Sequence, residues 1–600
     1  MSYDRNEIKP EYTWDLSKIY ADSAAFEAAL ADTEKKIKAF SKHEKTIIRS
    51  AAELACALDD YFAIDALIDR LWSYAYLHFA LDTSNNDYQS LTGRVRTLAV
   101  SAGSATWFVT PYILRLERST LEAWLGECEG LHTYRRFLEK TILEKPHTLS
   151  DECERLMSSL DNCLGTHDQI RGIFADSDMR FGKIKDEQGK RVELTGANYG
   201  VYLRSGERRV RMAAFREMYK TYGSFINTFA TVYNGRVKEA TTLARVRGYK
   251  DSLTASTFRD EVTPEIYNNL IKTVEANLEP LYDYYALKRD ALGVDKLHLY
   301  DVYAPLVGSL TRKYSYEEAV ADVLDTCKIY GEEYYENLKA GLTENRWVDV
   351  YPTRGKRGGA FATSGSGTEP FILLNYTENY DDVSTLAHEA GHAMHTLFST
   401  RYNEPHNSNY TIFVAEVAST VNELLLAHRK LAACESDEEK LYILDGLMET
   451  YKATLYRQTM FAFFEQKAHA LSERGETLTA DLLNKQYYKL VKKYFGKDVA
   501  CDKAIAMEWA RIPHFYSCFY VYKYATCISA ASAIVKRIET EGEAYVGKYI
   551  DFLKCGGAKS PLDSLLVAGI DMRDPAVVSD AIDDFRSCVK QFTEIYNKNK

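Results

Sequence analysis

The sequence predicts a mainly α-helical protein. Apolar residues recur at three- and four-residue steps through most of the 600-residue chain, which is the spacing of one face of a helix. Only 12 prolines interrupt this pattern, and no Pro/Gly/Ser-rich linker divides it, so we expect one large helical body with a cleft rather than a string of small domains. Strand signals are few and short.

The apolar spacing predicts helices separated by short polar turns. In the first part of the chain their expected ranges are 23–43, 50–68, 70–90, 92–110, 115–127, 132–144 and 149–163. Further helices are expected at 207–247, 264–292, 316–342, 381–400, 411–433, 437–472, 479–495 and 516–540. Many of the 44 tyrosines fall on the same faces as Leu and Ile, so we expect most of them in the core or lining a cleft.

One predicted hairpin suggests a domain boundary. Residues 181–185 and 191–194 read as short strands around a turn that contains Gly189. Long helices resume after this hairpin. We therefore expect an N-terminal helical domain over 1–200 and a second domain over 201–600.

A second pair of strands is expected at 347–351 and 371–375. The loop between them is rich in Gly and Ser and comes shortly before the helix expected at 381–400. An exposed edge strand near Phe361 or 370–376 could pair with an extended peptide. The alternative is a structural hairpin in which the glycines only make turns.

Composition excludes several classes of function. The chain has 75 basic and 86 acidic residues, a net charge of −11 and no basic stripe, which argues against nucleic acid as a partner. Its 11 cysteines form no C-x-x-C pair, so we expect reduced, mostly buried thiols. The N-terminus is polar, and the longest uncharged stretch is broken by Pro111, so we expect no signal peptide, no membrane span and a cytoplasmic protein.

Residues 388–392 read His-Glu-Ala-Gly-His inside a predicted helix. Two histidines four residues apart share one helical face, so His388 and His392 can bind one metal ion. Glu389 lies on a different face beside them, where it can take a proton from a water molecule rather than coordinate. This H-E-x-x-H pattern is typical of zinc metallopeptidases. The alternative is a pair of surface histidines around a solvated Glu.

The surroundings of the motif refine this hypothesis. Asp381 and Asp382 are expected to cap the helix and to place negative charge at its positive end. Gly391 weakens the helix, which suggests that another backbone or the metal site approaches closely there. His395 shares the histidine face but lacks the spacing of a metzincin ligand, so we expect it beside the ligands or in the core.

A catalytic zinc ion needs a third protein ligand and an open position for water. Glu416 lies in an apolar run of the helix expected at 411–433, where a carboxylate is costly to bury unless a cation neutralises it. Glu423 lies two turns later and could accept the free ring N–H of a ligating histidine; the alternative is a half-exposed helix carboxylate. The aminopeptidase-type spacing would need a ligand at Thr411 and is disfavoured. We therefore expect one zinc ion per chain, held by His388, His392 and Glu416.

The motif at 388–395 followed by Phe-Val-Ala-Glu-Val-Ala-Ser-Thr-Val-Asn-Glu at 413–423 resembles the M3 metallopeptidases, and within them the oligoendopeptidase F branch. Further segments that resemble this branch are 12–20, 296–305, 355–360, 370–376, 512–516 and 519–524. The resemblance spans nearly the whole chain. It implies a helical fold of two halves around a deep channel, zinc on the channel floor, and cleavage of short peptides rather than proteins.

The late segment 510–524 carries a dense group of aromatic residues. Members of the M3 family use a His and tyrosines from the corresponding region to stabilise the oxyanion. The resemblance therefore suggests this role for His514 and Tyr522, with Tyr516 as a third candidate. Aromatic helix packing is the alternative for each of them.

The sequence thus predicts a zinc-dependent endopeptidase for short oligopeptides. Glu389 is the expected general base, and Gly359, Ala360 and Phe361 are the expected substrate contacts. One alternative is a carboxy-exopeptidase on the same scaffold, which would need a cation such as Arg354, Lys356 or Arg357 for the substrate carboxylate. The other is a peptide-binding protein without turnover, which would be expected to lack a ligand or the base. The oligomeric state stays open.

Overall fold

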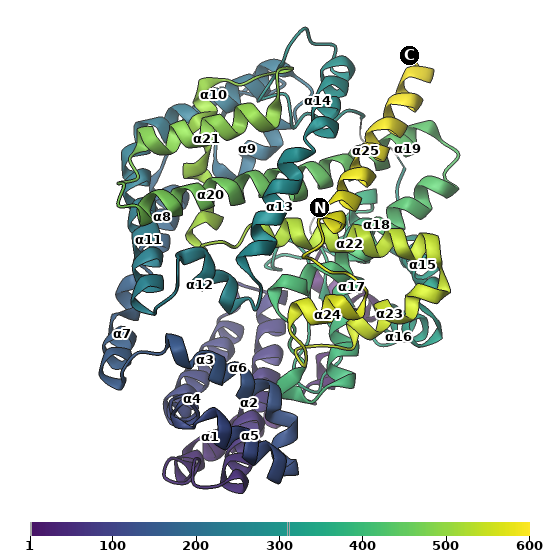
Figure 1. Ribbon diagram of the computed structural model, residues 1–600. Coiled ribbons are helices and arrows are strands. Elements are labelled where there is room, and N and C mark those ends of the chain that lie inside the picture. Colours follow the sequence, from purple (N-terminus) through teal and green to yellow (C-terminus); the bar gives the residue numbers. More distant parts are fainter. Residues whose placement is uncertain (1–2, 309, 311) are drawn as a thin grey trace. The chain divides into compact units, whose positions relative to one another are not determined.

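A computed structural model describes residues 3–308, 310 and 312–600 of the chain. Its elements are mainly α-helices with a few short strands (Figure 1), which confirms the predicted fold class. Within the described residues, no helix combines the length and the apolar character needed to cross a membrane.

Two compact units, each assembled from separate stretches of the chain, make up the structure. Unit 1 comprises residues 1–146, 311–429 and 534–570, and unit 2 comprises residues 147–310, 430–533 and 571–600. The channel that the family resemblance implies, and the division of the sequence at residue 200, both stay predictions.

Unit 1 contains the first six helices and those around the His-Glu-Ala-Gly-His motif. Its helices are α1 (Ser23–Ala39), α2 (Ala51–Leu81), α3 (Asn86–Thr106), α4 (Val109–Arg115), α5 (Arg118–Glu127), α6 (Arg135–Leu143), α15 (Tyr316–Cys327), α16 (Glu332–Leu342), α17 (Tyr380–Tyr402), α23 (Glu543–Leu553) and α24 (Pro561–Val567). Most of α18 (Ile412–Ala433) and the end of α22 (Tyr522–Glu541) also belong to this unit.

Unit 2 contains the remaining helices. They are α7 (Asp151–Leu164), α8 (Thr166–Ile173), α9 (Gly196–Leu203), α10 (Arg208–Ser224), α11 (Ile226–Val246), α12 (Ser252–Arg259), α13 (Pro264–Ala276), α14 (Glu279–Ala291), α19 (Asp437–Tyr451), α20 (Arg457–Glu473), α21 (Ala480–Phe495) and α25 (Pro575–Lys598). A π-helical turn at Lys452–Tyr456 joins α19 to α20, so the helix expected at 437–472 runs on through an irregular turn.

Some helix boundaries differ from the sequence prediction. The prediction of two helices at 50–68 and 70–90 is wrong, because the single helix α2 continues unbroken to Leu81. The next helix, α3, starts anew where the Asn85 side chain accepts hydrogen bonds from the backbone N–H of Asp87 and Tyr88. The single helix expected at 207–247 is instead two, α10 and α11, which meet at Phe225.

The prediction also missed helices, the longest of which is α25. The sequence contains local features that predict this helix. Asp574 caps the helix, Pro575 occupies the first turn, and residues such as Val578, Ile582 and Phe585 form a buried face.

The predicted hairpin near residue 186 is confirmed. Strand β1 (Lys183–Lys185) pairs antiparallel with β2 (Arg191–Glu193) in unit 2. A second small sheet in that unit pairs β3 (Leu297–His298) parallel with β7 (Val499–Ala500).

A three-stranded sheet in unit 1 lies beside α17. Strand β6 (Phe371–Leu373) is its middle strand and pairs with β4 (Val348–Asp349) on one side and with β5 (Phe361–Thr363) on the other. The expectation of a free edge at 370–376 is therefore wrong, because both sides of β6 are hydrogen-bonded. Strand β5 supplies an edge instead, at the other expected position near Phe361, and both β5 and β6 contact α17.

The core of the first helices anchors this sheet. Phe371 and Leu373 of β6 belong to the same buried apolar cluster as α1, α2 and α3, and α2 and α3 lie side by side (Figure 1). The buried indole N–H of Trp14 also reaches the carbonyl oxygens of Trp347 and Ile372, at 2.8 and 2.9 Å. The N-terminal segment therefore fixes the strands that face α17.

All eleven cysteines are free, as predicted. The expectation that most are buried is wrong: only Cys327, Cys527, Cys555 and Cys588 are.

Candidate metal centre

Helix α17 begins with a capping box that differs from the predicted cap. The Asn379 side chain accepts the N–H of Asp382, and the Asp382 carboxylate accepts the N–H of Asn379, at 3.0 and 3.3 Å. Asp381 and Asp382 are therefore first-turn residues and not the N-cap. Their negative charge still faces the positive end of the helix dipole.

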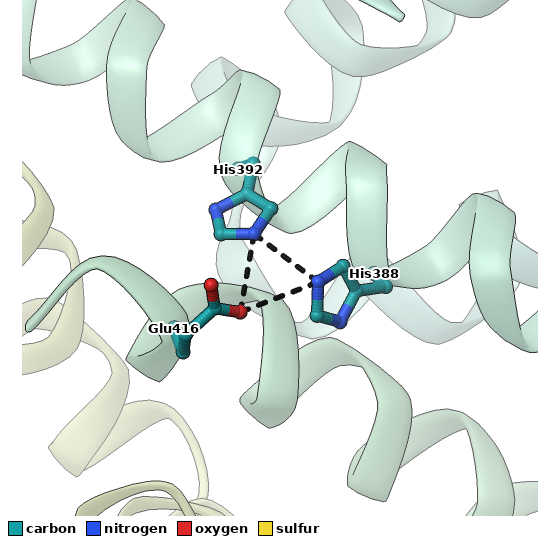
Figure 2. Close-up of side chains that lie close together, drawn as sticks. All are labelled: His388, His392 and Glu416. Atoms are coloured by element: carbon teal, nitrogen blue, oxygen red, sulfur yellow. Dashed lines mark hydrogen bonds and ion pairs between the residues drawn. The ribbon is translucent and has the colours of Figure 1, made fainter. Parts of the chain in front are cut away.

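The two histidines of the motif point at one place, where they meet Glu416 of α18 (Figure 2). His388 Nε2 and His392 Nε2 are 3.1 Å apart, and Glu416 Oε2 lies 3.4 Å from each. The three side chains remain partly exposed, at 25%, 18% and 36% respectively. One side of the group is thus open to a water molecule or a substrate.

The spacing of these three atoms suits a tetrahedral zinc ion. Zinc binds His nitrogen and carboxylate oxygen at about 2.0–2.1 Å, which places neighbouring ligands of a tetrahedron about 3.3–3.4 Å apart. The Glu416 distances match this value, and the distance between the histidine nitrogens is shorter by about 0.2 Å. Two imidazoles and one carboxylate are also a donor set that zinc prefers in catalytic sites.

Gly391 explains how α18 comes close enough to supply Glu416. A Cβ at this position would lie 2.6 Å from the carbonyl oxygen of Ala418 and 2.6 Å from the Cα of Ser419. Only a glycine therefore allows the two backbones to approach so closely. The predicted close approach at Gly391 is confirmed.

A buried asparagine, which the sequence analysis did not single out, reinforces this crossing. Asn422 of α18 donates from Nδ2 to the carbonyl oxygen of Ala387, just before the first histidine, at 3.2 Å. Its Oδ1 accepts the hydroxyl of Tyr330 at 3.1 Å. A buried amide in an otherwise apolar helix stretch was the signal that could have identified it.

Glu423 lies against the other ring nitrogen of His388, with Oε2 3.3 Å from Nδ1. This contact favours the tautomer that carries its proton on Nδ1, so the lone pair of Nε2 faces the group in Figure 2. Glu423 is 30% exposed and lies beside the histidine ring, and its role in holding that ring stays a prediction.

The electrostatics of the group favour a positive charge. Burial lowers the pKa of His388, but the carboxylates of Glu423 and Glu416 outweigh it and raise that pKa well above its usual value. Burial raises the pKa of Glu416, yet contacts with both histidines lower it strongly overall. Carboxylates that hold a proton on an imidazole in this way would equally stabilise a metal cation.

Glu389 is buried, with 5% of its surface exposed, and its Oε2 has no hydrogen-bond partner among the residues that the structure describes. Burial raises the pKa of this carboxyl, and the two neighbouring histidines only partly offset the effect. A desolvated carboxylate with one oxygen left free is suited to accept a proton.

His395 is buried beside the group but does not join the three donor atoms. Its ring stacks on Tyr410 with centroids 3.8 Å apart, and burial lowers its pKa to about 3. It therefore stays a neutral packing residue one turn from His392.

Of the predicted substrate contacts, Phe361 lies in the edge strand β5, and Gly359 and Ala360 immediately precede it. Asn375 donates to the carbonyl oxygen of Gly359 at 2.7 Å, and Ala360 leads into β5. The ring of Phe361 is partly exposed and lies 5.6 Å from that of Tyr76. The outer side of β5 has no partner strand in the described part of the chain.

The basic residues of the preceding loop differ in their surroundings. Lys356 is fully buried, with Nζ 2.7 Å from the Asp349 carboxylate, so it serves the fold. Arg357 lies over the rings of Tyr76 and Phe361, and Arg354 is exposed.

The late aromatic residues belong to unit 2. The hydroxyl of Tyr522 donates to Asp260 at 3.1 Å, and Tyr516 is buried with its carbonyl held by Arg236. The ring of His514 lies 6.0 Å from those of Tyr520 and Tyr524. Tyr520 and Tyr524 belong to the aromatic segment 510–524 but were not among the three predicted donors.

Comparisons with known proteins agree on one family. The model described as "Peptidase family M3" matches residues 201–584, and one described as "Oligopeptidase F" matches residues 113–181. The chain is 40% identical to the oligopeptidase PepF of Bacillus subtilis, over all of this chain and 89% of that protein. It is 35% identical to an oligoendopeptidase F homolog of Borreliella burgdorferi, over 99% of this chain and all of that protein. The solved structure of oligoendopeptidase-F from Enterococcus faecium is similar, with a TM-score of 0.75, 30% identity and coverage of 96% of this chain and 99% of that one.

Proposed function

The chain belongs to peptidase family M3, and from this premise we propose that it is a zinc-dependent endopeptidase of short oligopeptides. The observation that carries the proposal is the triangle of donor atoms from His388, His392 and Glu416, with edges of 3.1–3.4 Å that suit tetrahedral zinc. Glu423 would hold the His388 ring in the ligating tautomer. When bound, zinc supplies a Lewis acid that polarises the substrate carbonyl and makes water easier to deprotonate.

Glu389 is the proposed general base. Its free, buried Oε2 would accept a proton from the attacking water, and the resulting acid would return a proton to the leaving amine. Because burial raises its pKa, the carboxyl is better able to accept and then release that proton than an exposed Glu would be.

We propose that the substrate backbone pairs with the free edge of β5, with Gly359, Ala360 and Phe361 as contacts. Support comes from the position of β5 against α17, the helix that carries the two histidines. Strand addition uses only backbone groups of the peptide, which suits an enzyme that accepts varied sequences.

Donors for the developing oxyanion are proposed from the late segment. His514, Tyr522 and Tyr516 keep this role as candidates from the family resemblance. Tyr520 and Tyr524 join them because their rings neighbour His514, whereas the Tyr522 hydroxyl already binds Asp260.

We also keep the division into an N-terminal helical domain at 1–200 and a catalytic domain at 201–600 as a proposal. A cytoplasmic location stays a prediction of the sequence.

The alternative functions are weaker. A carboxy-exopeptidase needs a free cation near the substrate, and Lys356 is already paired with Asp349, which leaves Arg354 and Arg357 as candidates. A peptide-binding protein without turnover does not explain why three donor atoms and a free carboxylate come together.

The test uses the purified protein with a short internally quenched peptide. We expect cleavage at an internal bond, loss of activity after removal of metal by a chelator, and recovery on addition of zinc. Product mass spectrometry on peptides with blocked and free C-termini separates the endopeptidase from the exopeptidase. Activity that survives complete metal removal, or release of C-terminal fragments from unblocked peptides only, would contradict the proposal.

A further inference from the structure

Unit 2 contains a second group of metal-ligating side chains, separate from the motif on α17. Glu465 and His469 lie one turn apart on α20, and Cys518 comes from the loop before α22. One donor atom from each residue lies within 4.8 Å of the other two. Glu465 and His469 are buried, at 0% and 1% exposure, whereas Cys518 is partly exposed at the margin of the group.

Two polar atoms of this group are buried without a partner. Neither Glu465 Oε2 nor His469 Nε2 has a hydrogen bond to any described part of the chain. A buried polar atom without a partner is unfavourable, so two of them in one group call for an occupant. The buried hydroxyl of Tyr233 also has no partner among the described residues. Burial raises the pKa of this hydroxyl, and the nearby Glu465 and Cys518 raise it further.

The hydrogen bonds of Ser252 fix which nitrogen of His469 is free to coordinate. The Ser252 hydroxyl donates its single proton to Glu473 at 2.6 Å. It must therefore accept from His469 Nδ1–H, 2.9 Å away. The proton of the neutral ring is then on Nδ1, and Nε2 keeps a lone pair that is free to bind a metal ion.

The charges of the group would balance those of a divalent cation. Without one, burial raises the pKa of Glu465 to about 8, desolvation raises that of the Cys518 thiol to about 12, and burial lowers that of His469 to about 3. All three groups are then mostly neutral near pH 7. One carboxylate, one thiolate and a neutral imidazole would together cancel the charge of a divalent ion, which makes its burial tolerable.

We propose that Glu465, His469 and Cys518 form a second metal site that takes zinc or a similar thiophilic divalent cation. Tetrahedral zinc with one sulfur ligand keeps its donor atoms about 3.3–3.6 Å apart. Even at the limit of 4.8 Å, two donor atoms reach this distance if each moves by about 0.6 Å. Such a displacement is within reach of small side-chain rotations. A water molecule completes the fourth position.

The site would fasten the loop that carries Cys518 to α20. Phe519 already has a left-handed backbone, with φ of 57°, and its N–H donates to Glu465 Oε1 at 2.7 Å. Ser256 donates to the Cys518 carbonyl oxygen at 3.2 Å. A metal bond to Cys518 Sγ adds a third attachment, and it holds in place the chain between His514 and Tyr520.

The test is cobalt substitution, because this group contains a sulfur ligand and the group on α17 does not. The protein is produced with Co²⁺ in place of zinc and freed of loosely bound metal. We expect a thiolate-to-cobalt charge-transfer band in the near ultraviolet, which the donor set of His388, His392 and Glu416 cannot give.

Three variants test whether the charge-transfer band comes from a bond between the metal and Cys518. Cys518→Ser should abolish it and lower the bound metal by about one equivalent per chain, whereas Cys501→Ser, at a partly buried thiol of the same unit, should change neither. His388→Ala should keep the band. Failure of the proposed zinc site on α17 can therefore be distinguished from failure of this second site. Absence of the band in the wild-type protein, or its survival in Cys518→Ser, would overturn the proposal.

Discussion

Gly391→Ala should weaken metal binding without unfolding the protein. The added Cβ would lie 2.6 Å from two main-chain atoms of α18, the carbonyl oxygen of Ala418 and the Cα of Ser419. Carbon atoms in van der Waals contact are about 3.5–4.0 Å apart. Because main-chain atoms cannot rotate away as a side chain can, we expect α17 and α18 to separate locally by about 1 Å.

This displacement acts directly on the donor triangle. The histidines belong to α17 and Glu416 to α18, so the 3.4 Å distances between them would grow to about 4 Å or more. Overpacking of this kind costs about 1–3 kcal/mol of stability, which a chain of this size should tolerate. Loss of residues that support metal ligands typically lowers metal affinity by about 10–100-fold, and we expect zinc affinity to fall by at least that much. At limiting zinc concentrations kcat should fall in parallel.

The assay compares zinc retained after dialysis against a competing chelator, kcat with a quenched peptide at several zinc concentrations, and Tm. Gly446→Ala is the matched control, since it also lies within a helix and no atom lies within 4 Å of its added Cβ. That variant should keep its zinc and be more stable by up to about 1 kcal/mol. Wild-type zinc affinity and kcat in Gly391→Ala would refute the argument that this crossing sets the ligand spacing.

Three further outcomes are expected. Glu389→Gln should lower kcat by at least about 10²–10⁴-fold with unchanged zinc content and Tm, because the amide cannot accept a proton; retention of more than about a tenth of kcat would exclude Glu389 as the base. Glu416→Ala should lose zinc in elemental analysis, and Glu423→Gln should lose less; full zinc occupancy in Glu416→Ala would remove it from the ligand set. Burial lowers the pKa of His78 from 6.5 to about 4, so the unfolded chain binds more protons between those values and stability should fall as the pH drops through them. His78→Gln should make that fall shallower in urea unfolding at pH 7 and pH 5, and a slope equal to that of the wild type would contradict the assignment.

Much of the candidate site was readable because its geometry is local. His388 and His392 share a face through the helical repeat alone, and a carboxylate at 416 in an apolar run indicated a cation before any fold was known. The cap was wrong because Asn and Asp are both good N-caps, and the sequence cannot say which of Asn379, Asp381 and Asp382 accepts the first free N–H.

The group of Glu465, His469 and Cys518 could be predicted from the sequence only in part. Glu465 and His469 have the same four-residue spacing as the two histidines of α17, so that half was visible in the sequence. Cys518 joins them through a loop whose course depends on Phe519 adopting a positive φ, a conformation that its residue type does not suggest. The sequence left two positions for the edge strand, near Phe361 and at 370–376, because the choice depends on which strands pair in the folded protein.

The sequence by itself determined the helical class, the helix faces and the chemical types that each face presents, because helical periodicity follows from hydrogen bonds within a few residues. Only the tertiary structure decided which faces meet and at what distance. The 3.4 Å between Glu416 and the histidines depends on two backbones in contact at Gly391 and on the buried Asn422 that joins the helices. Such distances are set by close packing between segments far apart in the chain, where the shape of every neighbouring side chain contributes.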